Sequence, residues 1–182
     1  MSQRFRIGMF FLIPLIILVD QWSKLLILNE PRFNALPCLD GTGGCGHIEL
    51  SNVFDLTMVW NRGVSFGMGQ SEGVMRWLLV AMTVGIAIGF TVWLFRATRI
   101  LTGLALAMVV GGAIVNVIDR VRFGAVVDFL NFSDIYFVWV FNVADAAISV
   151  GAVLLFVDQF LMSRQEKNSA GAEAKLNGED AQ

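Results

Sequence analysis

Hydrophobic positions fall into four long runs along this chain, and polar segments separate them. The runs cover residues 7–28, 75–95, 100–118 and 142–162. Each is long enough to cross the hydrocarbon core of a bilayer, which needs roughly 20 residues of helix. We therefore predict four transmembrane helices, and four crossings place both ends of the chain on the same side of the membrane.

The first run stays in the protein as a helix according to its pattern. It is too long for a cleaved signal peptide, and no small-residue cleavage site follows it. Its C-terminal end is also too polar, because it holds Asp20, Gln21, Ser23 and Lys24. We expect this end to lie at a membrane surface.

The polar segment at residues 29–72 predicts a small β-sheet. Its opening "LPCLDGTGGCG" is rich in turn formers. "HIELSNVFDLTMVW" then gives two β-prone runs broken at Ser51 and Asn52, and "NRGVSFG" supplies a turn and a return. The alternative is an ordered loop that only connects helices. The later segment at residues 120–141 is apolar but interrupted by charges, so we expect it to lie along the membrane surface.

Composition supports a membrane protein. Hydrophobic residues make up 56% of the 182 residues and charged residues 15%, whereas soluble domains are about 45–50% apolar. The net charge of −2 gives no indication of nucleic-acid binding. Residues 163–182 are polar and rich in small side chains, which predicts a disordered tail behind a membrane domain at residues 1–162.

Basic residues beside the runs predict the orientation. Arginine and lysine are enriched on the cytoplasmic side of membrane helices. One set of helix ends carries Arg4, Arg6, Arg96, Arg99, Arg164 and Lys167. The other side also has basic residues, which weakens the bias: Arg32, Arg62, Arg76, Arg120 and Arg122. We expect both termini to be cytoplasmic and residues 29–72 to be periplasmic.

The two cysteines, Cys38 and Cys45, both lie in the segment expected outside the cytoplasm. Disulfides persist in that compartment, so we predict that these residues form one. The single histidine, His47, has no paired histidine or further cysteine beside it. This composition does not match a zinc site, and we interpret His47 as a surface residue.

Polar side chains collect at the outer ends of the helices. Three runs and two connecting segments contribute the following residues: Asp20, Lys24, Asn61, Arg62, Asn116, Asp119, Arg120, Asp128, Asn142 and Asp145. Asp20 and Lys24 are one helical turn apart and can pair on a shared face. Asp20 with Lys24, and Asp119 beside Arg120, are therefore interpreted first as structural ion pairs.

Asp128 and Asp145 have no cation beside them in the sequence, so each is expected to need the other. Two carboxyls that share a site cannot both ionise cheaply, and they hold a proton between them. Such a pair can activate water by general acid–base catalysis. No serine or cysteine has a plausible histidine partner, and no cluster of carboxylates and histidines indicates a catalytic metal.

Five motifs in order resemble those of bacterial lipoprotein signal peptidase, also called signal peptidase II. They read "DQWSK", "NRGVSFG", "GGAIVNVIDR", "VVDF" and "FNVADAA", and they extend from Asp20 to about Gly151. The resemblance implies an all-α membrane protein with four transmembrane helices and a small periplasmic β-sheet. It also implies an aspartyl endopeptidase of the bacterial inner membrane that needs no cofactor or metal.

The substrates implied by this resemblance are prolipoproteins that carry a diacylglyceryl group, cut just before the modified cysteine. The expected partners are these substrates and membrane lipid, with no nucleic acid, and the expected state is a monomer. Asp128 and Asp145 match the catalytic dyad. Positions that shape the site or hold the substrate match Asp20, Lys24, Asn61, Asn116, Asp119, Arg120 and Asn142.

Two departures from the family pattern stand beside these matches. Val115 takes a position where glycine is usual, and Ser65 one where alanine is usual. Asn142 is expected to cap the fourth helix, with Asp145 in its first turn near the positive end of the helix dipole. This arrangement predicts that Asp145 lies at the membrane surface, where water can enter.

Two other classes are compatible with acids in membrane helices. A proton or ion relay predicts acids spread through the depth of the membrane, whereas these acids gather at one side. Presenilin-like proteases carry a "GxGD" signature, which this chain lacks. Both therefore fit the sequence less well than the lipoprotein peptidase.

Overall fold

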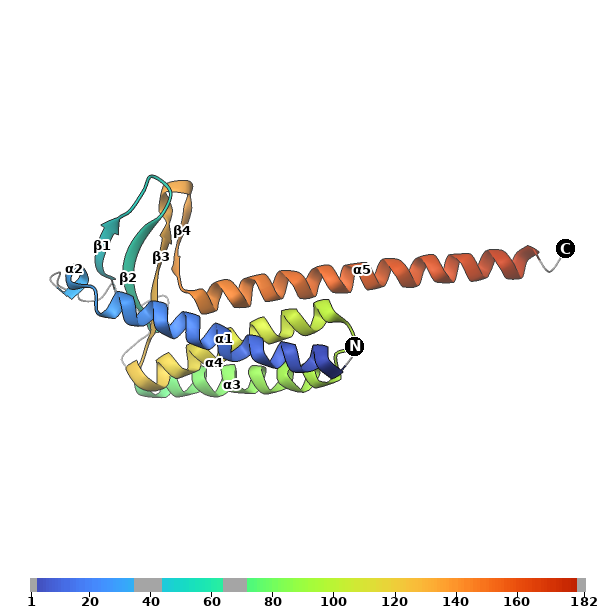
Figure 1. The fold of residues 1–182 in the computed structure, drawn as a ribbon, viewed down its shortest axis with the longest axis horizontal. Coiled ribbons are helices and arrows are strands. Elements are labelled where there is room, and N and C mark those ends of the chain that lie inside the picture. The colour runs from blue at the N-terminus through green and yellow to red at the C-terminus, as the bar shows by residue number, and fades with distance from the viewer. Residues whose placement is uncertain (1–2, 35–43, 64–71, 180–182) are drawn as a thin grey trace.

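Four long helices form the body of the protein in the computed structural model, which describes residues 3–34, 44–63 and 72–179. They are α1 (Gln3–Leu28), α3 (Glu72–Arg96), α4 (Ile100–Phe123) and α5 (Val143–Glu179), and a short helix, α2 (Pro31–Asn34), follows α1. All four long helices contain segments that are long and apolar enough to cross a membrane, which confirms the four predicted spans. The start of α1 lies at one end of the bundle, and α5 extends well beyond that same end (Figure 1).

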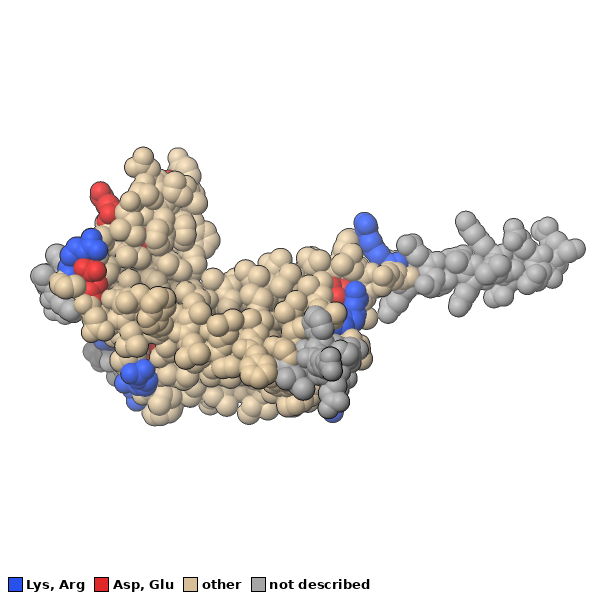
Figure 2. Space-filling view, in the orientation of Figure 1, with Lys and Arg blue, Asp and Glu red and all other residues tan. Residues whose placement is uncertain are grey.

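Helix α4 is the centre of the bundle, where it packs against α1, α3 and α5. In its most apolar window 67% of the residues are buried, against 17% to 22% for the other three helices. The outer surfaces of those helices expose large apolar side chains such as Phe11, at 70%, and Phe156, at 73%. Figure 2 shows a band without charged side chains between the two ends of the bundle, as a lipid-facing surface requires.

The backbones of α4 and α5 touch at two glycines. A Cβ atom on Gly112 would lie 2.5 Å from the carbonyl oxygen of Ala144, and one on Gly151 would lie 2.7 Å from that of Ala105. Both distances are too short for a real Cβ contact. Small residues allow such close packing in membranes, where van der Waals contact replaces the hydrophobic effect as a driving force between helices.

A four-stranded antiparallel sheet covers the end of the bundle opposite the start of α1 (Figure 1). Its strands follow the order β1 (Gly44–Glu49), β2 (Asp55–Asn61), β3 (Val126–Phe132) and β4 (Phe137–Phe141). Strands β1 and β2 confirm the sheet predicted within residues 29–72. Residues 120–141 were expected only to lie along the surface, but most of them form the second half of the sheet. Leu130 pairs with both Leu56 and Phe141, so the backbone hydrogen-bonding groups of this apolar segment find partners within the sheet.

A tight turn joins α4 to β3. Gly124 ends the helix in a left-handed conformation with φ of 79°, and its N–H donates to the carbonyl oxygen of Arg120. Glycine adopts this conformation without the steric cost that a Cβ atom adds. The turn brings Asp128, four residues further on, back over the end of the helices.

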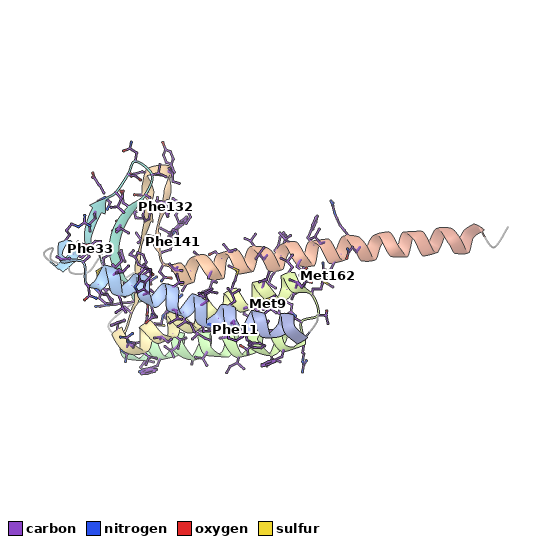
Figure 3. All side chains as sticks on the ribbon, viewed as in Figure 1. Met9, Phe11, Phe33, Phe132, Phe141 and Met162 are labelled. Carbon is purple, nitrogen blue, oxygen red and sulfur yellow. The ribbon has the colours of Figure 1, made fainter. Side chains whose placement is uncertain are left out.

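The sheet packs on the end of α1 through an apolar cluster. Its buried members are Ile27, Phe33, Ile48, Met58 and Phe129. Figure 3 shows Phe33 beside the sheet and Phe132 close to Phe141, whose rings stack with centroids 5.7 Å apart. Burial of the five side chains of the cluster fixes strands β2 and β3 on the bundle.

Three further expectations concern the tail, the proposed disulfide and the "NRGVSFG" turn. Helix α5 continues to Glu179, where the sequence predicts a disordered tail from residue 163. Alanine, glutamate and lysine favour helix, and no proline interrupts this part of the chain. The proposed disulfide involves Cys38, which lies outside the described residues, and so do residues 64–67 of the "NRGVSFG" turn.

Candidate active site

The polar residues singled out in the sequence come together where the sheet meets the bundle. Helices α1, α4 and α5 and strands β2 and β3 all contribute side chains. Six of these residues are buried, namely Asp20, Lys24, Asn116, Asp119, Asp128 and Asn142. The structure links them by the hydrogen bonds and ion pairs described below, as the predicted convergence at one membrane level requires.

Asp128 lies in β3 and is 1% exposed. Its Oδ2 accepts a hydrogen bond of 2.9 Å from Asn61 Nδ2, and its Oδ1 accepts one of 2.7 Å from Asn142 Nδ2. Pairing of Val59 with Asp128 in the sheet register places Asn61, at the end of β2, within reach. The carboxyl therefore has an amide donor on each oxygen.

The surroundings of Asp128 favour its neutral form. Burial, followed by the negative charge of Asp145, raises the pKa of Asp128 from 3.8 to about 7. The hydrogen bonds from Asn61 and Asn142 and the charge of Lys24 act in the opposite direction. Asp128 thus holds a proton below about pH 7.

Asp145 lies in the first turn of α5 and is half-buried. Its backbone N–H donates to Asn142 Oδ1 over 2.9 Å, and the Asn142 N–H donates to Asp145 Oδ2 over 3.4 Å. These reciprocal bonds confirm the predicted helix cap. Asn116 Nδ2 from α4 donates to Asp145 Oδ1 over 2.8 Å, which leaves Oδ2 as the less tightly bonded oxygen of this carboxylate.

Asn142 joins the two carboxyl groups directly. Its side-chain amide nitrogen bonds Asp128, while its side-chain oxygen accepts from the backbone of Asp145. The same nitrogen lies 3.5 Å from Asn116 Oδ1. One buried residue thus contacts both predicted catalytic acids and a third polar partner.

The other two acids of the site are bound to a lysine. Lys24 Nζ lies 2.6 Å from Asp20 Oδ2 and 2.7 Å from Asp119 Oδ2, so the predicted pairing of Asp20 with Lys24 is confirmed. The salt bridge of Asp119 is with Lys24 of α1, although the sequence suggested its neighbour Arg120. Adjacent residues on a helix point in different directions, and this separates the Asp119 and Arg120 side chains.

The charge of Arg120 acts on Asp145 and Asp128 instead. Arg120 Nη1 donates to the carbonyl oxygen of Asn116 over 3.1 Å. Its positive charge interacts most strongly with Asp145 and less strongly with Asp128. The cation therefore acts on both acids of the predicted dyad.

The role of Gln21 in this site was not predicted from the sequence. Gln21 Nε2 donates to Asp119 Oδ1 over 2.8 Å, and Gln21 Oε1 accepts from Arg122 Nη1 over 3.1 Å. A signal was present, because Gln21 lies three residues before Lys24 and therefore shares its helix face. The glutamine extends the polar network from α1 to the end of α4.

A metal site is not formed by the described residues, which include no group of three or more histidine, cysteine or acidic side chains suited to an ion. His47 lies in β1 with an exposed side chain, where Nδ1 is 2.7 Å from Thr57 Oγ1. It thus has the surface position expected for it.

Known proteins share this arrangement of helices and sheet. A family model described as Signal peptidase (SPase) II matches residues 12–161. The chain belongs to the signal peptidase II family. It is 43% identical over 146 residues to a lipoprotein signal peptidase of Caulobacter vibrioides, which covers 80% of this chain and 82% of that protein.

A second relative and a solved structure extend the comparison. A lipoprotein signal peptidase of Methylobacterium radiotolerans is 42% identical over 163 residues, or 85% of each chain. A bacterial membrane enzyme structure matches with a TM-score of 0.69 and 21% identity, over 86% of this chain and 89% of that one. The signal peptidase II family and the four apolar helices identify this chain as a bacterial multi-pass membrane protease.

Proposed function

We propose that this protein is an aspartyl endopeptidase that removes the signal peptide from prolipoproteins carrying a diacylglyceryl group, with cleavage just before the modified cysteine. The relatives above are named lipoprotein signal peptidases. The observation that carries the catalytic proposal is the bonding of Asn142 to both Asp128 and Asp145. This places a buried, proton-holding carboxyl beside a half-buried one.

The two carboxyls divide the work of hydrolysis. Asp145 is the more accessible acid, so its carboxylate takes a proton from a water molecule as the water oxygen attacks the peptide carbonyl carbon. Asp128 donates its proton to the carbonyl oxygen, which gives a neutral tetrahedral intermediate. The C–N bond then breaks, the proton on Asp145 goes to the leaving amine, and the carbonyl re-forms as its hydroxyl proton returns to Asp128.

Neighbouring groups keep the pair in its working state. Asn61 and Asn142 orient the Asp128 carboxyl, and Asn116 holds Asp145 Oδ1. The positive charge of Arg120 offsets negative charge on the dyad. These groups are fixed before substrate arrives, and such preorganisation lowers the barrier to reaction.

The sheet end of the bundle is proposed to face the periplasm, with both termini in the cytoplasm. The support is the cluster of basic residues at the other end, including Arg96, Arg99 and Arg164. In this orientation Asp128 and Asp145 lie on the periplasmic side, from which a peptide with its lipid anchor in the outer leaflet can approach them. A reporter fused after Gln165 should read cytoplasmic, and a periplasmic reading would reverse the orientation.

Cleavage of a defined substrate tests the proposal. Purified protein in detergent is offered a prolipoprotein with and without its diacylglyceryl group, and products are identified by mass. We expect cleavage before the modified cysteine only when the lipid is present. Equal cleavage of the unmodified substrate would contradict the proposed specificity, and no cleavage of either would contradict the proposed activity.

A further inference from the structure

The site contains two further acids, Asp20 and Asp119. Each accepts a hydrogen bond from the backbone next to one member of the proposed dyad. Asp20 Oδ1 accepts a hydrogen bond of 2.8 Å from the N–H of Ala144, the residue before Asp145. Asp119 Oδ2 accepts one of 3.3 Å from the N–H of Val127, the residue before Asp128. Two different elements are thus fixed at equivalent points, α5 by Asp20 and β3 by Asp119.

One cation joins these two contacts. Lys24 Nζ lies 2.6 Å from Asp20 and 2.7 Å from Asp119, and the lysine is 2% exposed. Asp20 and Asp119 are fully buried. Without the ammonium, two carboxylates would face each other away from water, where their repulsion is much stronger than in solution.

We propose that Lys24 is a positioning residue that sets the separation of Asp128 and Asp145 by drawing Asp20 and Asp119 together. This inference rests on the proposed function, which makes Asp128 and Asp145 the catalytic pair. The link runs through five residues in a fixed order, and each contact in it is an ion pair or a hydrogen bond to backbone. Ala144 and Val127 are both fully buried, so neither backbone segment can easily move to absorb a change in that link.

The second link between the acids is weaker. It consists of the neutral amide of Asn142, which bonds Asp128 with its nitrogen and the Asp145 backbone with its oxygen. Asn142 also contacts backbone on both sides, at the Asp145 N–H and, over 3.4 Å, at the Val127 carbonyl oxygen, but it carries no charge, whereas the lysine bridge contains two ion pairs. The bridge therefore sets where α5 and β3 lie, and Asn142 then orients the carboxyls.

The pH dependence of activity provides a measurement that depends on the charge of Lys24. Asp128 is affected by Asp145 from α5 and Lys24 from α1, and Arg120 from α4 interacts with both dyad acids. The positive charge of Lys24 lowers the pKa of Asp128. Replacing Lys24 by a neutral residue must then raise this pKa, and the pH at which activity declines on the alkaline side should increase.

The test is the Lys24→Met variant, assayed on diacylated prolipoprotein at matched folded concentration. We expect kcat to fall by about 10²-fold, the order of loss that misplaced catalytic groups produce, with little change in KM. The alkaline limb of the kcat profile should move to higher pH. Unchanged kcat per folded molecule, or an unchanged pH profile, would overturn the positioning role.

A matched control exists at the other end of the bundle. Arg99 Nη2 lies 3.2 Å from Oδ1 of the buried Asp158. This ion pair also joins α5 to the start of α4. Arg99→Met removes this pair far from the dyad. It should lower thermal stability but leave kcat per folded molecule and the pH profile as in the wild type.

A double-mutant cycle covers the case in which Lys24→Met does not fold. Asp20→Asn and Asp119→Asn each keep an oxygen that can accept the backbone N–H but weaken the bond to Lys24. Because both act through one lysine, the double variant should lose less kcat than the product of the two single losses. Losses that simply multiply would contradict a shared bridge. Absence of cleavage by the wild type would instead contradict the proposed function.

Discussion

The two ends of the helix bundle both contain buried acids, but they balance the charge differently. At the end away from the sheet, Asp158 is fully buried, pairs with Arg99 and accepts a hydrogen bond from the Thr102 hydroxyl. At the sheet end, four acids share the charges of Lys24 and Arg120. The acids are Asp20, Asp119, Asp128 and Asp145.

We interpret this difference as the distinction between a structural acid, Asp158, and the acid proposed to be reactive, Asp128. Asp158 has a cation and a hydroxyl donor, so its charge is matched. At the sheet end Asp128 is buried beside Asp145, and burial followed by the charge of Asp145 lets Asp128 keep a proton up to about pH 7. An unmatched carboxyl that exchanges a proton near neutral pH is suited to acid–base catalysis.

The largest expected effect comes from removing either unmatched acid. Asp128→Asn and Asp145→Asn keep the side-chain size but remove the acid or the base, and each should reduce kcat by roughly 10²–10⁴-fold. The double variant should be scarcely worse than either single one, because the two act as a unit. Cleavage of diacylated prolipoprotein by purified, folded protein measures this loss.

Asp119→Asn serves as the comparison within the same site, since it alters an acid already held by Lys24, Gln21 and Val127. It should lose less activity than either dyad variant. A well-folded but inactive Asp119→Asn, with near-normal turnover by Asp128→Asn, would transfer the catalytic role from Asp128 to Asp119.

A smaller effect is expected in the pH dependence. Because the pKa of Asp128 is raised to about 7, its proton is present below that pH and lost above it, so kcat should decline as pH rises through about 7. Asn61 lowers this pKa by donating to the carboxylate. Asn61→Ala should therefore shift the decline to higher pH in a kcat profile.

The direction of that shift is the informative part. A decline that moves to lower pH in Asn61→Ala would mean that the amide does not stabilise the ionised carboxylate. Asn131→Ala is a suitable control, because Asn131 also lies in the sheet but donates to Thr57. It should leave the pH of the decline unchanged.

The smallest effect on activity is expected at the matched end. Asp158→Asn removes the charge partner of Arg99, and loss of a charged hydrogen bond costs about 1–3 kcal/mol. The expected result is a lower thermal midpoint in detergent, with unchanged kcat per folded molecule. A catalytic defect as large as that of Asp128→Asn would mean that the two ends are coupled.

Much of the fold could be predicted from hydrophobic patterning. The spans are long and nearly free of charge, and bilayer thickness sets their length, so their bounds agree closely with the apolar segments of the four helices, although α5 itself continues to Glu179. Strands β1 and β2 were recognisable because a turn at Ser51 and Asn52 separates two β-prone runs. Strands β3 and β4 were not predicted, since a run such as "FVWVF" reads equally well as part of an apolar helix.

The site was predictable in its members but less so in its pairings. The Asp20–Lys24 contact follows from spacing along one helix, and so does the Asn142–Asp145 cap. The contact between Asp119 and Lys24 joins α4 to α1 and depends on how the helices pack, which spacing within one helix cannot reveal. The bond from Asn61 to Asp128 likewise depends on the register between β2 and β3.

The glycine contacts between α4 and α5 have a consequence for how far the two helices can slide. Asn116 on α4 bonds Asp145 on α5, so an axial displacement of one residue, about 1.5 Å, would break this bond. Gly112 and Gly151 each accept the partner backbone only where no side chain intervenes. Close backbone contact at these two glycines fixes the axial position of α5 relative to α4. The position of Asp145 along the bundle is therefore set by residues that have no reactive side chain.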